Sequence, residues 1–163
     1  MTDYDRLDAW VDAHFDEEVR FLQSLVRVPT DTPPGNNAPH AVRTAELLQD
    51  FGFEAEAHPV PADAVKDYGL ESITNLIVRR EYGPGRRIAL NAHGDVVPPG
   101  DGWQHDPYGG EIEDGSLYGR ASAVSKSDFA SFTFAVRALE AVAKPGHGSV
   151  SYTHLRAHET RED

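Results

Sequence analysis

Residues 87–99 read Arg-Ile-Ala-Leu-Asn-Ala-His-Gly-Asp-Val-Val-Pro-Pro, and this stretch decides the fold. The apolar run at residues 88–90 predicts a strand, which the two prolines bring to an end. Because residues two apart on a strand project to the same face, we expect His93 and Asp95 side by side at the carboxyl end of this strand. Ligands of open α/β sheets bind beyond that end, so the pair is the first candidate site.

His93 and Asp95 have the chemistry of a metal site. An imidazole binds divalent transition metals, and a carboxylate beside it either binds the ion as well or orients the histidine. Taken alone, the three-residue pattern also fits a histidine that only forms hydrogen bonds at the end of a strand. The sequence on either side of His93 and Asp95 is therefore needed to distinguish the two interpretations.

The pattern on either side of this stretch predicts an α/β fold with a mixed sheet flanked by helices. Apolar residues recur at helical spacing in three segments, and the second of these places Val42, Ala45 and Leu48 inward and His40 at the surface. Strands are expected before the quoted stretch, whose own strand should be central in the sheet, and Asp114-Gly115 predicts a hairpin turn. The expected helices are 5–27, 40–50 and 126–143, the expected strands are 53–60 and 73–79, and the expected hairpin is 111–118.

The composition narrows the classes of partner and site. The 163 residues include 15 basic and 27 acidic side chains, which gives a net charge of −12 and argues against nucleic acid and membrane partners. With no cysteine, any metal must be bound by His, Asp or Glu. The N-terminus has no apolar core of a signal peptide, and we expect a cytoplasmic protein.

A longer series of motifs follows the first. His93-Gly-Asp-Val-Val-Pro98 precedes Gly102-Trp103, then Asp106-Pro-Tyr-Gly109, Gly115-Ser-Leu-Tyr-Gly-Arg120 and Lys126 at the start of a helix. In order and spacing this series resembles the M20 family of metal-dependent peptidases and deacylases, up to about Val150. The family includes acetylornithine deacetylase, succinyl-diaminopimelate desuccinylase, aminoacylase and carboxypeptidase G-like enzymes.

The resemblance implies a partial zinc-aminopeptidase-like catalytic domain over residues 1–150. It gives His93 the role of a metal ligand and Asp95 that of a catalytic residue that supports the ligand. The cofactor would be a divalent metal, Zn²⁺ with Co²⁺ or Mn²⁺ as alternatives, and the substrate a small peptide or an N-acyl amino acid. Trp103, Asp106 and Tyr108 would either shape the rim of the site or pack their loop against the sheet. The full-length parent could be a homodimer.

The chain departs from the family motif Gly-Arg-Gly-x-x-Asp-x-Lys-Gly, whose Asp bridges two metals. The corresponding segment is Gly119-Arg-Ala-Ser-Ala-Val-Ser-Lys-Ser127, so the bridging position is Val124. Asp128 lies one helical turn further on and could supply the carboxylate as a metal ligand. Alternatively, Asp128 is only an acidic residue in the first turn of a helix, and the site has one metal or none.

The end of the chain departs further. The family continues with a strand that ends in paired acidic residues, a general base and a metal ligand, whereas residues 151–163 have no Glu-Glu pair and no strand alternation. They resemble vector or adapter sequence at the end of truncated reads, so we expect a non-native or disordered tail that packs poorly. The fragment would then be inactive. Alternatives to an enzyme are a non-catalytic pseudo-enzyme that binds a small ligand, or a fragment with no autonomous function.

Overall fold

A computed structural model describes residues 1–154, the last three of them by their backbone alone. The described residues form four helices and six strands, of which the third helix and the last strand were not among the predicted elements. The helices are α1 (Asp3–Val26), α2 (Ala38–Asp50), α3 (Ala62–Asp67) and α4 (Lys126–Val142). The strands are β1 (Ala55–Pro59), β2 (Thr74–Gly83), β3 (Arg87–Ala92), β4 (Glu111–Glu113), β5 (Ser116–Tyr118) and β6 (Gly148–His154).

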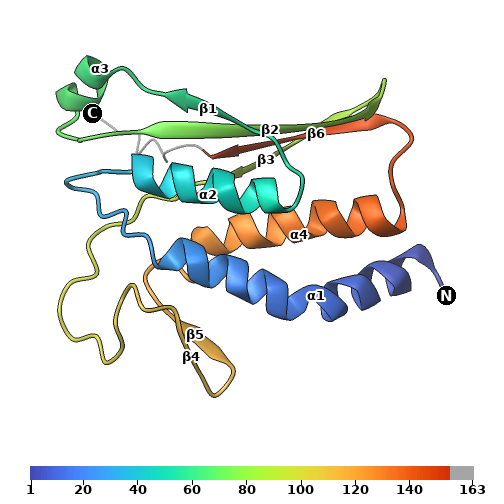
Figure 1. Ribbon diagram of the computed structural model, residues 1–163, viewed down its shortest axis with the longest axis horizontal. Coiled ribbons are helices and arrows are strands. Elements are labelled where there is room, and N and C mark those ends of the chain that lie inside the picture. The colour runs from blue at the N-terminus through green and yellow to red at the C-terminus, as the bar shows by residue number, and fades with distance from the viewer. Residues whose placement is uncertain (155–163) are drawn as a thin grey trace, which may run out of the picture.

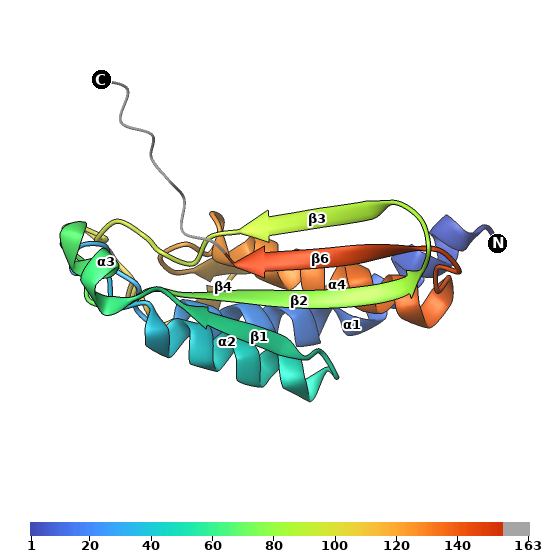
Figure 2. The same cartoon turned by 90° about the horizontal axis from the view of Figure 1, so that it is seen from above.

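The main sheet is mixed, as expected for this α/β chain. Its strand order is β1-β2-β6-β3, with β2 antiparallel to both of its neighbours and β3 parallel to β6. The strand of the quoted stretch, β3, therefore lies at an edge of the described sheet, and the prediction that it is central is wrong. The position between β2 and β3 belongs to β6, the last strand along the chain (Figure 2).

The position of β6 also corrects the expectation for the end of the chain. Ser151 pairs with Arg79 on one side and Ala89 on the other, and the pairing on both sides continues to His154. A strand between two others is held by backbone hydrogen bonds along both edges, so it can form without an alternating apolar pattern. Poor packing from Ser151 onward is thus wrong for residues 151–154, and the rest of the predicted tail lies outside the described residues.

Helices α1, α2 and α4 lie on one face of the sheet, and the short α3 lies at one end of it (Figures 1 and 2). Helices α2 and α4 contact the strands, and α1 packs against both of these helices. The core between the layers is built from aromatic and aliphatic side chains that are at most 4 % exposed, among them Phe21, Leu25, Leu48, Phe129 and Phe134. None of the helices within residues 1–154 combines the length and apolar character needed to cross a membrane.

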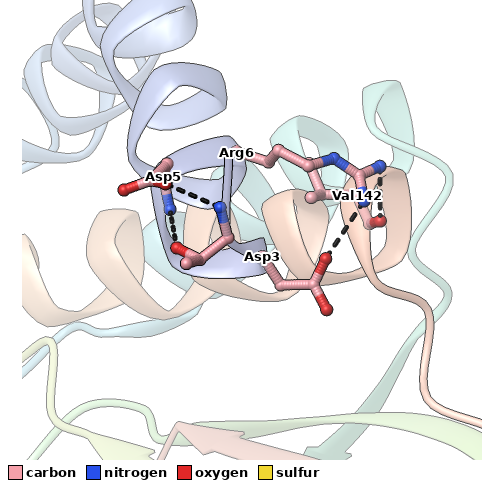
Figure 3. Close-up of polar contacts among 5 residues, drawn as sticks. Asp3, Asp5, Arg6 and Val142 are labelled. Carbon is pink, nitrogen blue, oxygen red and sulfur yellow. Dashed lines mark hydrogen bonds and ion pairs between the residues drawn. The ribbon is translucent and has the colours of Figure 1, made fainter.

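Helix α1 begins with a capping box and is joined there to the end of α4 (Figure 3). The backbone N–H of Asp5 donates to Thr2 Oγ1, and the Asp5 carboxylate accepts from the Thr2 backbone N–H. Arg6 pairs with Asp3 and donates from Nη2 to the backbone oxygen of Val142 at 3.1 Å. These contacts satisfy backbone groups at the ends of two helices, which packing alone would leave without partners.

The structure places His40 in the interior, so the prediction of a surface position is wrong. The side chain is 0 % exposed, its ring meets Phe129 edge-on at 5.7 Å, and Thr44 packs against it one turn later. Val42, which was expected inward, is 60 % exposed. Polar residues on the buried face of α2 account for the error, because hydrophobic periodicity does not count them.

Candidate functional site

His93 and Asp95 lie next to each other immediately beyond the end of β3. His93 Nδ1 is 3.0 Å from the backbone oxygen of Asp95 and 3.4 Å from its carboxylate Oδ1. The His93 side chain is 33 % exposed and that of Asp95 is 14 % exposed. The strand ends at Ala92, so the pair belongs to the following loop, and Gly94 between them is buried. The predicted juxtaposition is present, on a loop rather than on a strand.

The geometry determines which nitrogen of His93 is available. A backbone oxygen can only accept a hydrogen bond, so Nδ1 must carry the proton that it donates to Asp95. Nε2 then has a free lone pair, which is the form of imidazole that binds a metal. Asp95 Oδ1 is buried and accepts no hydrogen bond from the described part of the chain. The group that orients the imidazole is therefore the backbone carbonyl of Asp95, one of the usual partners of a histidine ligand.

Asp128 and Val124 do not complete a metal site with this pair. Ser125 Oγ donates to Asp128 Oδ2 at 2.5 Å in the first turn of α4, and Val124 is 69 % exposed. Among residues 1–154, no three or more His, Asp or Glu side chains gather closely enough to hold a metal ion. The described residues therefore fit one histidine ligand with a carboxylate beside it, and they do not fit a complete site.

The loop residues that follow are engaged in packing the loop. Trp103 Nε1 donates to the backbone oxygen of Pro99 at 2.9 Å, and Asp106 Oδ1 accepts from the backbone N–H of Tyr108 at 2.8 Å. The Tyr108 hydroxyl donates to the Asp31 carboxylate, and burial together with this bond raises the pKa of Tyr108. These contacts favour the interpretation of Trp103, Asp106 and Tyr108 as residues that hold the loop.

Two residues near the site were missed by sequence reasoning. Thr30 is 1 % exposed, and its Oγ1 donates to the backbone oxygen of Gly94 at 2.5 Å. Lys126 is 0 % exposed, and burial lowers its pKa to about 7, although the charge of Asp31 opposes this change. The one signal in the sequence is a lysine at the first position of an apolar helix, and its complete burial is unusual for this residue type.

Comparison with known proteins agrees with the fold and the motif. Residues 89–160 match the family described as Peptidase family M20/M25/M40. Succinyl-diaminopimelate desuccinylase of Wolinella succinogenes is 36 % identical over 122 residues, which are 75 % of this chain and 30 % of that protein. The same enzyme of Rhodospirillum centenum is 36 % identical over 138 residues, or 83 % of this chain and 33 % of that protein. The chain thus spans about a third of the length of these curated relatives.

Solved structures share the fold at lower sequence identity. Human carnosine dipeptidase 1 superposes with a TM-score of 0.73 at 22 % identity, over 92 % of this chain and 34 % of that one. The M20 family metallo-carboxypeptidase Sso-CP2 from Sulfolobus solfataricus gives 0.71 at 17 % identity, over 85 % and 30 %. The predicted partial M20-type α/β domain is confirmed as a fold. Together, the matched motif region and the two relatives show that the chain is similar to peptidase family M20.

Proposed function

We propose that this chain carries part of the active site of a metal-dependent hydrolase that cleaves an amide bond in a small peptide or an N-acyl amino acid. The observation that carries the proposal is the tautomer of His93, whose Nδ1 donates to Asp95 and whose Nε2 is left to bind a metal. The similarity to a desuccinylase and to a dipeptidase supports an amide substrate of this size.

In this proposal His93 binds the ion and Asp95 holds the imidazole in the binding tautomer. Zn²⁺ suits a site of histidine and carboxylate, with Co²⁺ or Mn²⁺ as alternatives. When bound, the ion would polarise the carbonyl and make a bound water more acidic. Since residues 1–154 supply one such ligand pair, the remaining ligands and the general base would come from other parts of the protein. We place the protein in the cytoplasm, with a homodimer as its proposed assembly.

A second candidate is a binding protein without catalysis, and Val124 favours it. The family motif has a metal-bridging carboxylate where this chain has an exposed valine. The contact of Asp128 with Ser125 gives no support to a substitute carboxylate at this place. A protein of this kind would bind a peptide or an acyl amino acid and release it unchanged.

The test compares metal binding with turnover. The 163-residue chain should bind Zn²⁺ weakly in calorimetry, His93→Ala should abolish that binding, and His58→Ala should retain it. His58 is a matched control because it is a half-exposed histidine on β1 that also lies beside a carboxylate, that of Glu56. Equal binding by the His93→Ala chain would refute His93 as a ligand.

Activity is assayed on a protein expressed from the complete reading frame, with N-succinyl and N-acetyl amino acids and dipeptides. Turnover should be lost in His93→Ala and reduced about 10–100-fold in Asp95→Asn, the usual effect of changing a group beside a metal ligand, because the variant removes the negative charge 3.4 Å from His93 Nδ1. Saturable binding of the same compounds without turnover would support the binding protein instead.

A further inference from the structure

A second segment of the chain runs alongside the loop that carries the candidate site. We call residues 28–32 the bracing segment and residues 93–96 the His93 loop. Val96 donates from its backbone N–H to the Thr30 oxygen at 3.1 Å, and its own oxygen accepts from the Thr32 N–H at 2.8 Å. Thr30 Oγ1 adds a bond to the Gly94 oxygen. The His93 loop is thereby fixed along one side by strand-like pairing with a segment more than 60 residues earlier in the chain.

Lys126 holds the start of the bracing segment by two hydrogen bonds. Its Nζ donates to the backbone oxygens of Leu25 at 3.1 Å and Val28 at 2.7 Å, where the chain leaves α1. A buried amine is unfavourable unless it is hydrogen-bonded, so these two bonds keep the Lys126 side chain at this place. The Leu25 oxygen also accepts from the backbone N–H of Val28 at 3.2 Å, so Lys126 adds two bonds at the turn that ends α1. Lys126 therefore determines where the bracing segment begins.

The orientation of His93 depends on this bracing because of the partner that its ring uses. Nδ1 donates to the backbone of Asp95, two residues ahead in the same loop, so any movement of that backbone turns the ring. The residue before this carbonyl is Gly94 and the residue after it is Val96, and both are bonded to the bracing segment.

We propose that Thr30 and Lys126 are positioning residues, which hold the His93 loop through the bracing segment and so keep His93 in the single tautomer that exposes Nε2. Lys126 acts on Val28, Thr30 acts on Gly94, and neither touches His93 in the described contacts. The role of His93 as a metal ligand rests on the proposed function, whereas the control of its tautomer can be measured without any metal.

The first experiment compares Thr30→Val with Thr30→Ser in the metal-free chain. Side-chain nitrogen resonances of His93 are recorded by NMR at pH 8, where an ordinary imidazole is neutral, and assigned by their loss in His93→Gln. The wild type should show two widely separated nitrogen shifts, as expected for one tautomer. Valine keeps the shape of Thr30 but has no hydroxyl, so the shifts should converge. Serine keeps the hydroxyl, so Thr30→Ser should show the same wide separation of the two His93 nitrogen shifts as the wild type. A folded Thr30→Val chain with unchanged His93 shifts would overturn the proposal.

The second experiment replaces Lys126 by Met and uses Arg137→Met as its control. Arg137 lies about three turns further along α4 and also bonds to α1, through Glu17 at 2.7 Å. Lys126→Met should make the His93 shifts converge, and Arg137→Met should leave them in place at a comparable loss of stability. Equal effects of the two variants would mean that Lys126 acts only on overall stability, and the proposal would fail. If Lys126→Met does not fold, the Thr30 pair decides alone. Failure to bind Zn²⁺ would contradict the proposed function and leave the tautomer result intact.

Discussion

Ala121 stands where the family motif has a glycine, and it has the backbone conformation of one. Its φ of +66° is in the left-handed region, and the residue is 8 % exposed. Side chains other than glycine reach this region at a cost of about 1–2 kcal/mol, because Cβ approaches the following carbonyl oxygen. The motif glycine thus has a conformational reason, and this chain carries alanine there in spite of the strain.

We predict that Ala121→Gly stabilises the chain by up to about 1 kcal/mol. The relief of strain should exceed the about 0.4–1 kcal/mol that glycine costs through the entropy of the unfolded state. Urea unfolding measures the difference. Ala130→Gly is the control, because it removes a methyl group inside α4, where it should destabilise the chain by at least about 1 kcal/mol. A loss of stability in both variants would show that the conformation at Ala121 carries no strain.

The positions of single buried polar residues were the part of the site that the sequence could not predict. His93 and Asp95 could be paired in advance, since the spacing along a strand end places them together. The interior positions of His40 and Lys126 could not be predicted, because each side chain contacts residues far away in the sequence. The same holds for Thr30, whose bond to Gly94 connects segments that only the complete fold brings into contact.

At the scale of elements, helices and hairpins were predictable and the order of the strands was not. α1 and α4 follow from their 3.6-residue periodicity, and the β4–β5 hairpin turns at Asp114-Gly115, both with positive φ, as that sequence favours. The place of β6 depends on pairing with β2 and β3, which leave a space of one strand between them. Pairing between strands that are far apart in the chain cannot be predicted from the local sequence of each strand.

Strand β2 is tied to α4 by an ion pair that should make stability sensitive to acid. Arg80 donates from Nε and Nη2 to the two carboxylate oxygens of Glu140 at 2.8 and 2.7 Å, and the Tyr82 hydroxyl donates to the same carboxylate. The bonds from Arg80 hold the pKa of Glu140 below its usual value. With the folded-state pKa lowered, the contribution to stability is complete above the ordinary carboxyl pKa and is lost as the pH falls through the folded-state value.

We predict that Glu140→Gln lowers the free energy of unfolding by about 1–3 kcal/mol at pH 7, the usual range for hydrogen bonds to a charged group. The loss should shrink as the pH falls below the ordinary carboxyl pKa and through the lower folded-state pKa, because protonation of Glu140 removes the same ion pair from the wild type. Urea unfolding at pH 7 and at lower pH measures both effects. Glu46→Gln is the control, since Glu46 pairs with Arg43 on the exposed face of α2 and should change stability little. A Glu140→Gln effect that is the same at every pH would exclude the ion pair as its cause.

For the whole molecule, the series of motifs predicted more than any single element did. The order of His93-Gly-Asp95, the loop, the hairpin and the Lys126 helix indicated the M20 fold before any contact was known, and the fold is confirmed. What the series could not supply is the arrangement at the end of the chain. There residues 151–154 of the expected tail form the end of β6, between β2 and β3.

The last prediction concerns where the folded unit ends. A chain of residues 1–147 lacks β6, so β3 loses the strand that connects it to the rest of the sheet, and β2 loses one of its two neighbours. We expect this chain to show no cooperative urea transition, because unpaired strand edges and an opened core remain.

A chain of residues 1–154 retains every described strand. If the residues that follow are a tail, as their aperiodic and charge-rich sequence predicts, this chain should match the full-length chain within about 0.5 kcal/mol. Circular dichroism during urea unfolding of the three chains measures both effects. Cooperative unfolding of residues 1–147 at the full-length midpoint would show that β6 is dispensable, and a large loss in residues 1–154 would show that residues 155–163 belong to the folded domain.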